Sequence, residues 1–240
     1  MRIISLVPSI TESLIDLGCE NLVGRTKFCI HPAETVKEIP VVGGTKTLHL
    51  DKIRSLLPDL IIANKEENQK EQIEELAKTF EVRLMDVETF EDNFQLIRHL
   101  GEILNKNKEA EKYCLKIQNI FEQIQPQKSL KSAYLIWENP YMSIGHDTFI
   151  HQMMHQLGFE NIFGKDIRYP EIQKADMKEA EIILLSTEPY PFSEKHIPEF
   201  QKIYPDKKII IVDGEAFSWY GTHIAKCEEY YHQLLAKIRN

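Results

Sequence analysis

The sequence predicts an α/β protein with two parallel-sheet lobes joined by a long central α-helix. Three observations favour this fold class. Short apolar strands alternate with amphipathic helices from residue 3 to residue 87, the pattern is then helical to residue 124, and the alternation resumes at residue 133. We therefore expect a first lobe, a connecting helix and a second lobe over residues 1–88, 89–126 and 127–240.

In the first lobe, apolar runs alternate with segments of helical periodicity. The run 59–63 is continuously apolar, which is typical of a strand buried on both faces. Gly18 closes the first helix and Pro58 stops the second. The predicted strands and helices, in chain order, cover 3–7, 10–17, 22–24, 50–57, 59–63, 69–80 and 82–87.

The central segment carries one apolar stripe at spacings of three and four from Phe90 to Ile124. A polar junction at 105–108 is the point where a bend is expected, and Pro126 ends the helix. The pattern predicts a rigid connector rather than a flexible linker.

The second lobe repeats the alternation. Strands are expected at 133–137, 182–186 and 209–212. Asp147 is expected to cap a helix that Gly158 closes, and a final amphipathic helix is expected over Thr222–Ile238.

Composition excludes several classes of protein. A net charge of −8 disfavours a nucleic-acid partner, because nothing except local patches offsets phosphate repulsion. No stretch reaches the roughly 20 apolar residues of a membrane span. No signal peptide is recognised, which leaves two readings: an extracytoplasmic domain whose leader was removed, or a cytoplasmic protein with Met1 as its native start. Met1 directly precedes the first strand, which favours a native start.

No catalytic or metal-binding pattern stands out. The run Val42–Thr47 lacks the spacing of a phosphate loop, and neither a nucleophile elbow nor a GxGxxG is present. The four cysteines show no zinc spacing and suit free thiols. His151 and His155 share one helix face, but a solvated polar face is the favoured interpretation. His31 and His49 are better placed to offer an axial nitrogen to a bound metal. We expect neither an enzyme nor an intrinsic metal or cofactor.

Many short segments, in order along the chain, resemble one family. In the first lobe these are Ser5–Glu12, Leu17–Gly18, Val23–Gly24, Val42–Gly44, Leu50–Ile53 and Leu57–Ala63. In the second lobe they are Gly145, Leu157–Gly158, Glu160–Phe163, Tyr169–Pro170, Ile182–Ser186 and Asp213–Thr222. The chain resembles the substrate-binding proteins of ABC importers for cobalamin, haem and ferric siderophores, and the vitamin B12-binding subfamily in particular.

The resemblance implies two Rossmann-like lobes on one helical backbone, as in class III periplasmic binding proteins, with a metal chelate held in the cleft between the lobes. The loops after the strands would line that cleft. The ligand-contacting residues that it implies are Pro8, Ser9, Phe28, Gly44, Thr45, Asn64, Tyr141, His146, Tyr169, Glu215, Phe217, Trp219 and Tyr220. For Phe28, Phe217 and Trp219, packing beneath their own loops is the alternative.

The resemblance also implies docking on a permease through one carboxylate in each lobe. Asp51 matches the first position, whereas Ala175 falls near the second and Asp176 stands beside it. Capping of a helix is a sufficient alternative reason for Asp51. The chain departs from the cobalamin binders at Thr45 and Asn64, where they carry tryptophans, and at Gly221–His223, where many members have Gly-Pro-Arg.

These observations predict a monomeric, non-enzymatic binding protein for ABC-type import. Cobalamin or another corrinoid is the first ligand, and haem or a ferric siderophore follows. The alternative is a cytoplasmic corrinoid- or haem-handling carrier, or an enzyme, on the same fold.

Overall fold

The computed structural model describes residues 1–124 and 128–239, which divide into two compact units. Unit 1 comprises Met1–Val87, Glu91–Leu115 and Tyr220–His223, and unit 2 comprises Glu88–Phe90, Lys116–Trp219 and the chain from Ile224 onward. Each unit contains one four-stranded parallel sheet, so the predicted α/β class with two parallel sheets is confirmed. The predicted lobe boundary at 126–127 and the helix end at Pro126 lie outside the described residues.

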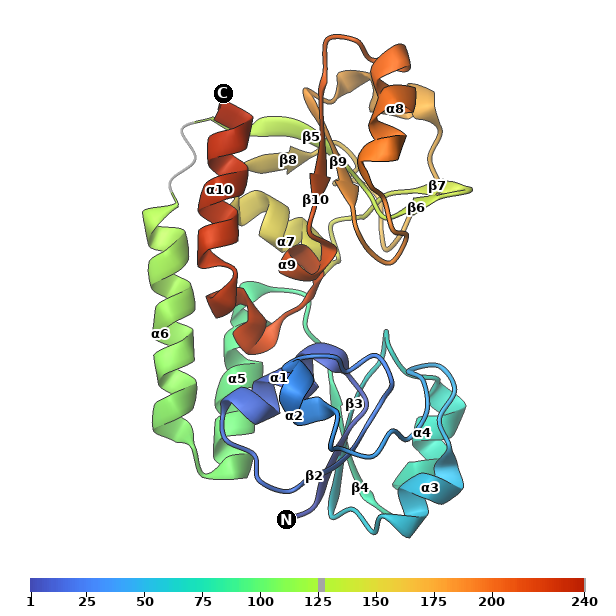
Figure 1. Cartoon of the computed structure of the whole chain (residues 1–240), viewed down its shortest axis with the longest axis vertical. Coiled ribbons are helices and arrows are strands. Elements are labelled where there is room, and N and C mark those ends of the chain that lie inside the picture. The colour runs from blue at the N-terminus through green and yellow to red at the C-terminus, as the bar shows by residue number, and fades with distance from the viewer. Residues whose placement is uncertain (125–127, 240) are drawn as a thin grey trace. The chain divides into compact units, whose positions relative to one another are not determined.

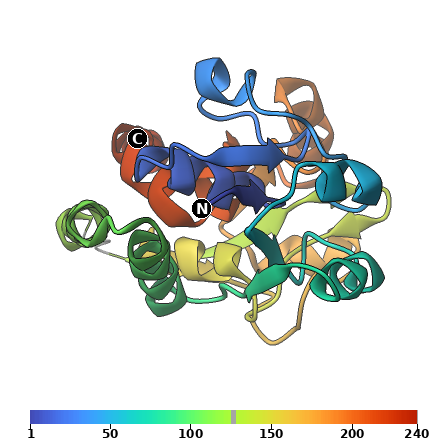
Figure 2. The ribbon, with the colours of Figure 1, turned by 90° about the horizontal axis from the view of Figure 1, so that it is seen from below.

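The sheet of unit 1 has the order β2-β1-β3-β4. Its strands are β1 (Ile3–Ser5), β2 (Leu22–Arg25), β3 (Leu60–Asn64) and β4 (Glu81–Met85). Its helices are α1 (Pro8–Asp16), α2 (Ala33–Val36), α3 (Leu50–Ser55), α4 (Lys70–Ala77) and α5 (Phe90–Leu104). Helices α3 and α4 cover one face of the sheet, and α1 and α5 lie on the other (Figures 1 and 2).

Every residue of β3 is buried, as its continuous apolar run predicts. Ile61 and Ala63 pack on Ile53 of α3 and Ile73 of α4. Because side chains alternate across a strand, the neighbouring Ile62 faces the side of α1 and α5. Burial on both faces fixes the register of β3, and with it the position of Asn64 at the carboxyl end of the sheet.

The sheet of unit 2 has the order β10-β9-β5-β8. The elements of unit 2, in chain order, are β5 (Leu130–Leu135), β6 (Trp137–Glu138), β7 (Tyr141–Met142), α7 (Phe149–Gln156), β8 (Phe159–Asn161), η1 (Lys174–Glu179), β9 (Ile182–Ser186), η2 (Glu194–His196), α8 (Ile197–Ile203), β10 (Lys208–Val212), α9 (Gly214–Ser218), and α10 (Glu228–Arg239). Phe200 of α8 packs with Ile183 and Leu185 of β9 on one face. Helices α7, α9 and α10 lie on the other side (Figure 1).

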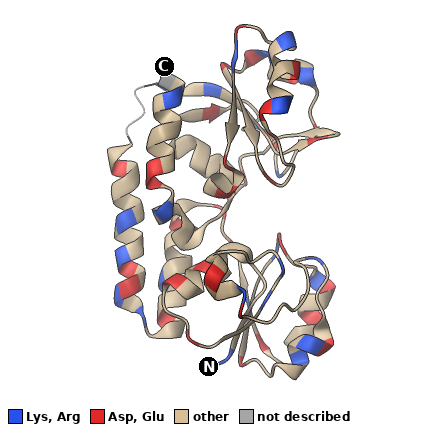
Figure 3. Cartoon of the chain, in the orientation of Figure 1, with Lys and Arg blue, Asp and Glu red and all other residues tan. Residues whose placement is uncertain are grey.

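The segment predicted as one helix is two helices, α5 and α6 (Asn107–Gln123), and the division between the units falls within α6. Asn105 adopts a positive φ of 56°, and the Lys106 amide donates to the Gly101 carbonyl oxygen at 2.7 Å. Such a bond closes a helix rather than continuing it, and Asn tolerates the left-handed backbone. The chain therefore reverses at the polar junction, and Figure 3 shows charges of both signs interspersed along α6.

Two further local predictions are wrong. Thr148, not Asp147, caps α7, because the Thr148 side chain accepts from the His151 amide, while Asp147 accepts from the Arg168 amide at 2.5 Å. The final helix is not continuous over Thr222–Ile238: a 3-10 helix, η3 (Gly221–Lys226), precedes α10. Within the described residues, no helix is long and apolar enough to cross a membrane. All four cysteines are free thiols.

Candidate functional site

Parallel strands place their carboxyl ends along one edge of each sheet, and ligands of open α/β sheets bind there. We call these the unit 1 edge and the unit 2 edge. Each is described from its own residues. The predicted ligand-contacting residues follow strand ends in both units, and their side chains differ widely in exposure.

At the unit 1 edge, Asn64 is the centre of a buried hydrogen-bond network. Its Nδ2 donates to the Tyr220 hydroxyl oxygen at 3.0 Å, and its Oδ1 accepts from the Glu66 amide at 2.6 Å. Its own amide donates to Asn68 Oδ1 at 2.9 Å. Asn64 is 2% exposed, so its side chain organises the loop after β3 and offers almost no surface to a ligand.

Tyr220 and Ser9 belong to the same network. Burial raises the pKa of the Tyr220 hydroxyl, the nearby Glu67 carboxylate raises it further, and a hydrogen bond with Ser9 opposes the rise. Tyr220 therefore stays a neutral phenol at physiological pH. The structure brings three predicted residues, Ser9, Asn64 and Tyr220, together, and all three are buried.

The loop after β2 and the loop 43–47 present the exposed part of the unit 1 edge. The Lys27 amide donates to the Gly43 carbonyl oxygen at 2.8 Å. Phe28 is 49% exposed, and the Lys27 ammonium nitrogen lies 5.0 Å from its ring centroid. Thr45 is buried, and its carbonyl oxygen accepts from Asn68 Nδ2 at 3.1 Å. Of the predicted aromatics in unit 1, Phe28 has surface available for a ligand.

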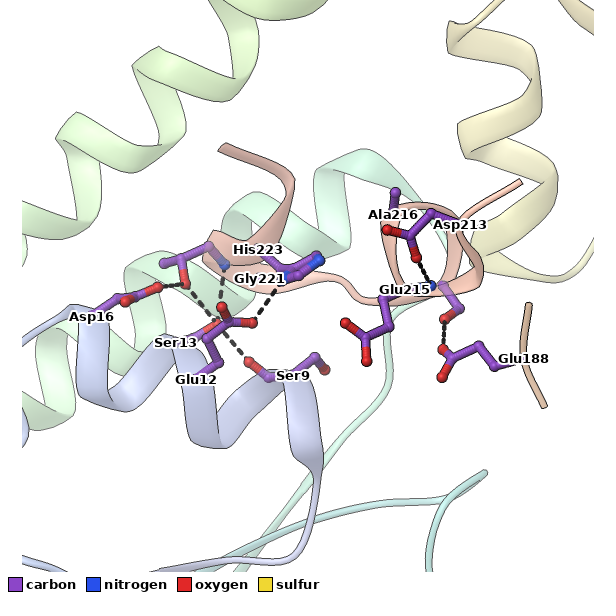
Figure 4. Close-up of polar contacts among 12 residues, drawn as sticks. Ser9, Glu12, Ser13, Asp16, Glu188, Asp213, Glu215, Ala216, Gly221 and His223 are labelled. Carbon is purple, nitrogen blue, oxygen red and sulfur yellow. Dashed lines mark hydrogen bonds and ion pairs between the residues drawn. The ribbon is translucent and has the colours of Figure 1, made fainter. Parts of the chain in front are cut away.

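Residues 220–223, called here the anchored segment, pack on α1 within unit 1 (Figure 4). The Thr222 amide donates to Ser13 Oγ at 3.0 Å, and the Thr222 hydroxyl donates to Asp16 at 2.6 Å. The His223 ring nitrogen Nδ1 lies 2.8 Å from a carboxylate oxygen of Glu12, which is 2% exposed.

On its other side the anchored segment contacts α5, where the Gly221 amide donates to Asn93 Oδ1 at 2.5 Å. His223 is therefore bound to a carboxylate of α1. The His31 ring lies 6.1 Å from the His223 ring.

At the unit 2 edge, carboxylates gather where β9 and β10 end. Ser218 Oγ donates to Glu188 at 2.9 Å, and Asp213 caps α9 by accepting from the Glu215 amide at 3.0 Å (Figure 4). Burial raises the pKa of Glu188. Hydrogen bonds with Ser218 and Trp219 oppose the rise, whereas the Glu215 carboxylate adds to it.

Phe217 and Trp219 support this edge from beneath. Phe217 is fully buried and packs on Tyr134 with the ring centroids 5.2 Å apart. Trp219 is 9% exposed and contacts Glu188. Both side chains therefore lie largely out of contact with solvent.

Three predicted residues of unit 2 have accessible surface: Tyr141 in β7, and His146 and Tyr169 on loops. The Tyr141 ring packs on Phe200, and its hydroxyl lies 3.4 Å from the Glu199 carboxylate. His146 is exposed, with Nδ1 2.7 Å from the Asp166 carbonyl oxygen. The Arg168 guanidinium lies 5.7 Å from the centroid of the half-buried Tyr169 ring.

The two predicted docking carboxylates differ in their local roles. Asp51 is fully exposed in the first turn of α3 and pairs with Arg54 at 2.9 Å. His49, not Asp51, is the N-cap of that helix. Asp176 accepts from the Gln173 amide at 2.7 Å and forms the capping box of η1, so a local role accounts for it.

Sequence reasoning missed the aromatic pair of the exposed Trp137 and the partly buried Tyr190, whose ring centroids lie 5.7 Å apart. Trp137 is 39% exposed, directly beyond β5, and Tyr190 donates to Glu138. The missed signal was the position of Trp137 two residues after the buried strand β5. Among residues 1–124 and 128–239, no group of three or more His, Cys, Asp or Glu side chains is placed to hold a metal ion.

Solved structures with the same fold include periplasmic binding proteins. The chain is similar to the periplasmic vitamin B12 binding protein BtuF of Vibrio cholerae, with a TM-score of 0.84, 19% identity, and coverage of 100% of this chain and 98% of that one. It is also similar to the periplasmic heme binding protein HutB of Vibrio cholerae, with a TM-score of 0.83, 18% identity, and coverage of 100% and 99%. Identities this low show the fold alone.

The chain is also similar in sequence to curated vitamin B12-binding proteins. A vitamin B12-binding protein of Pectobacterium carotovorum is 26% identical over 182 residues, which cover 72% of this chain and 66% of that protein. One of Vibrio cholerae is 24% identical over 194 residues, which cover 77% and 70%. The chain thus spans about two thirds of the length of these relatives.

The family model described as periplasmic binding protein matches residues 3–188. The chain belongs to the periplasmic binding protein family. Membership confirms the predicted resemblance, and the prediction of a binding protein rather than an enzyme agrees with it.

Proposed function

We propose that this chain binds a metal chelate for ABC-type import, with cobalamin or another corrinoid as the first ligand and haem or a ferric siderophore next. The names of the relatives, vitamin B12-binding and heme-binding proteins, support this ligand class. The relatives described as periplasmic also support a place of action outside the cytoplasmic membrane. A permease partner is part of the same proposal.

The observation that carries the proposal is the ring of Phe28, which is held half-exposed at the unit 1 edge. A corrin or porphyrin presents a broad flat face, and a rigid aromatic ring gives large contact at low entropic cost. Tyr169, half-buried at its loop in unit 2, offers a second ring of the same kind. Phe28 and Tyr169 remain our first candidates for ligand contact.

The carboxylates of the unit 2 edge favour a corrinoid among these ligands. Glu188 and Glu215 lie near enough for the Glu215 charge to raise the pKa of Glu188. The edge of a corrin carries amide groups that donate hydrogen bonds, which carboxylates accept. The carboxylates of haem or of many siderophores would instead be repelled.

Calorimetric titration of the purified protein with cyanocobalamin, hemin and a ferric siderophore tests the proposal. We expect one-to-one binding of cyanocobalamin below micromolar Kd, weakened about tenfold or more by Phe28→Ala, because a stacked ring contributes roughly 1–3 kcal/mol. Leu57→Ala is the matched control, because Leu57 is 70% exposed before the amino end of β3. Absence of binding to all three ligands would refute the proposed ligand class.

A further inference from the structure

We propose that Lys27 is a specificity residue of the ligand site, whose ammonium group binds an anionic oxygen carried on the rim of the flat chelate that Phe28 contacts. This inference rests on the proposed function and adds a charge requirement to it. The anionic oxygen belongs to a phosphate in a corrinoid nucleotide tail or to a carboxylate in a porphyrin side chain.

Buried contacts hold both ends of the loop segment 26–29, which follows β2. Thr26 and Cys29 are both buried, and Thr26 Oγ1 lies 3.2 Å from Cys29 Sγ. The Cys29 amide donates to the Thr26 carbonyl oxygen at 3.2 Å, and Thr11 Oγ1 donates to Cys29 Sγ at 3.1 Å. The residues on either side of Lys27 and Phe28 are therefore fixed in the core, and the two side chains between them project outward.

The loop 43–47 lies against these two side chains. The Lys27 amide is bound to Gly43, and the Gly44 amide donates to the Thr47 carbonyl oxygen at 2.8 Å. A methyl group placed on Gly44 would lie 3.4 Å from Phe28 Cε2 and 3.5 Å from Lys27 Cε. The ring and the lysine stem thus lie together over the glycine, with the ammonium nitrogen 5.0 Å from the ring centroid.

Lys27 differs from two other lysines of the unit 1 edge, Lys46 and Lys65, in its polar partners. The Lys46 ammonium donates to the Glu66 carbonyl oxygen, and Lys65 pairs with Asp86. In the described part of the chain, no carboxylate lies within ion-pair distance of the Lys27 ammonium. The Lys27 ammonium group lies over an aromatic ring that is itself half-exposed.

The loop after β2 thus presents an aromatic ring and a cation side by side. A ligand that stacks on the Phe28 ring brings its rim within reach of a cation held beside that ring. Ligand stacking also removes water from the ammonium group, which strengthens its attraction to an anion. A positive charge that already lies over an aromatic ring loses little freedom when the anion binds.

The test measures cyanocobalamin and dicyanocobinamide, which lacks the nucleotide tail and its phosphate, against the unaltered chain, Lys27→Met and Lys27→Arg. Methionine keeps the apolar stem over Gly44 and removes the charge, whereas arginine keeps the charge. We expect Lys27→Met to weaken cyanocobalamin binding about five- to tenfold, and Lys27→Arg to retain it. Cobinamide affinity should be the same in all three proteins.

Hemin, which carries carboxylates, and hemin dimethyl ester, in which they are esterified, form a second pair of ligands. If Lys27 binds a porphyrin carboxylate, Lys27→Met should weaken the binding of hemin and leave that of the ester unchanged. Lys52→Met on α3 is the control for removal of an exposed lysine charge. Raising the salt concentration should reduce the difference in ligand affinity between the unaltered chain and Lys27→Met, because salt screens interactions between exposed charges.

Equal affinities of the unaltered chain and Lys27→Met for both charged ligands would overturn the inference and leave the proposed function standing. An equal loss of affinity for the charged and uncharged member of each pair would also overturn it. If the unaltered chain bound neither a corrinoid nor hemin, the proposed function and this inference would both fail.

Discussion

At the residue scale, the conformation of Gly221 makes the close packing of the anchored segment possible. Gly221 has a φ of +87°, and a methyl group at this position would overlap the hydroxyl of Ser13. Glycine adopts this backbone without a steric penalty, which other residues do not. One residue therefore permits both the turn and the contact with α1.

We expect Gly221→Ala to destabilise the protein by at least about 2 kcal/mol, from left-handed strain and the overlap with Ser13 together. Gly18→Ala is a matched control, because Gly18 has a similar φ of +82° but its nearest neighbour is Lys106 Cε, 3.7 Å from the added carbon. The control should lose only about 1–2 kcal/mol. Urea unfolding followed by circular dichroism measures both, and equal losses would contradict the packing argument.

Glu188 carries a second prediction at this scale. Its folded pKa lies above the ordinary value of about 4.3, chiefly because of burial. Between these two pKa values the folded state binds more protons than the unfolded state, so the free energy of unfolding falls as pH rises through that interval. Glutamine does not ionise, so Glu188→Gln removes this pH-dependent fall in the free energy of unfolding. At pH values above the raised pKa, the variant should be at least as stable as the unaltered chain.

Thermal unfolding of Glu188→Gln from pH 4 to pH 8 measures this effect. Glu181 is a control whose pKa is shifted in the opposite direction, because hydrogen bonding with Lys128 lowers it. Glu181→Gln should therefore bring no gain of stability at neutral pH. A Glu188→Gln variant that loses stability steadily as pH rises above 5 would contradict the assignment.

At the element scale, α5 and α6 depend on close approach at Gly101. A methyl group on Gly101 would lie 2.6 Å from the Ala110 Cβ, and Arg98 of α5 pairs with Glu111 of α6 at 3.0 Å. The exposed ion pair contributes at most about 1 kcal/mol. The small residues therefore decide the packing distance where the chain reverses.

We expect Gly101→Ala to destabilise the protein by about 1–3 kcal/mol, although alanine is the better helix former, because the added methyl group overpacks the contact. The double variant Gly101→Ala with Ala110→Gly moves the methyl group to the opposite helix. It should recover part of the loss, since the overlap is removed while the helix-favouring residue is kept on α5. Urea midpoints of the two single variants and the double variant measure the coupling; additive effects would sink the packing argument.

At the scale of the whole molecule, the intrinsic fluorescence of the chain reports on unit 2. Both tryptophans, Trp137 and Trp219, lie in that unit, and they differ in exposure, at 39% and 9%. Acrylamide should quench the protein with Trp219→Phe, which retains Trp137, more strongly than the protein with Trp137→Phe. Equal quenching would show that the loop of Trp219 opens to solvent.

The chain belongs to its family although it is only 24–26% identical to these two curated relatives. Cores tolerate extensive exchange of apolar residues if volume and pattern are kept. A fold can therefore persist at identities this low.

The pattern of apolar residues along the chain was sufficient for the fold class and most elements. The strand over 182–186 was predicted with its observed bounds, because a short apolar run between polar residues is a local signal. Other features depend on residues far apart in sequence. Thr222 binds Ser13 across 209 positions, and Phe217 is buried against Tyr134 of β5. Local periodicity carries no information on such partners, which exist only once helices and strands pack.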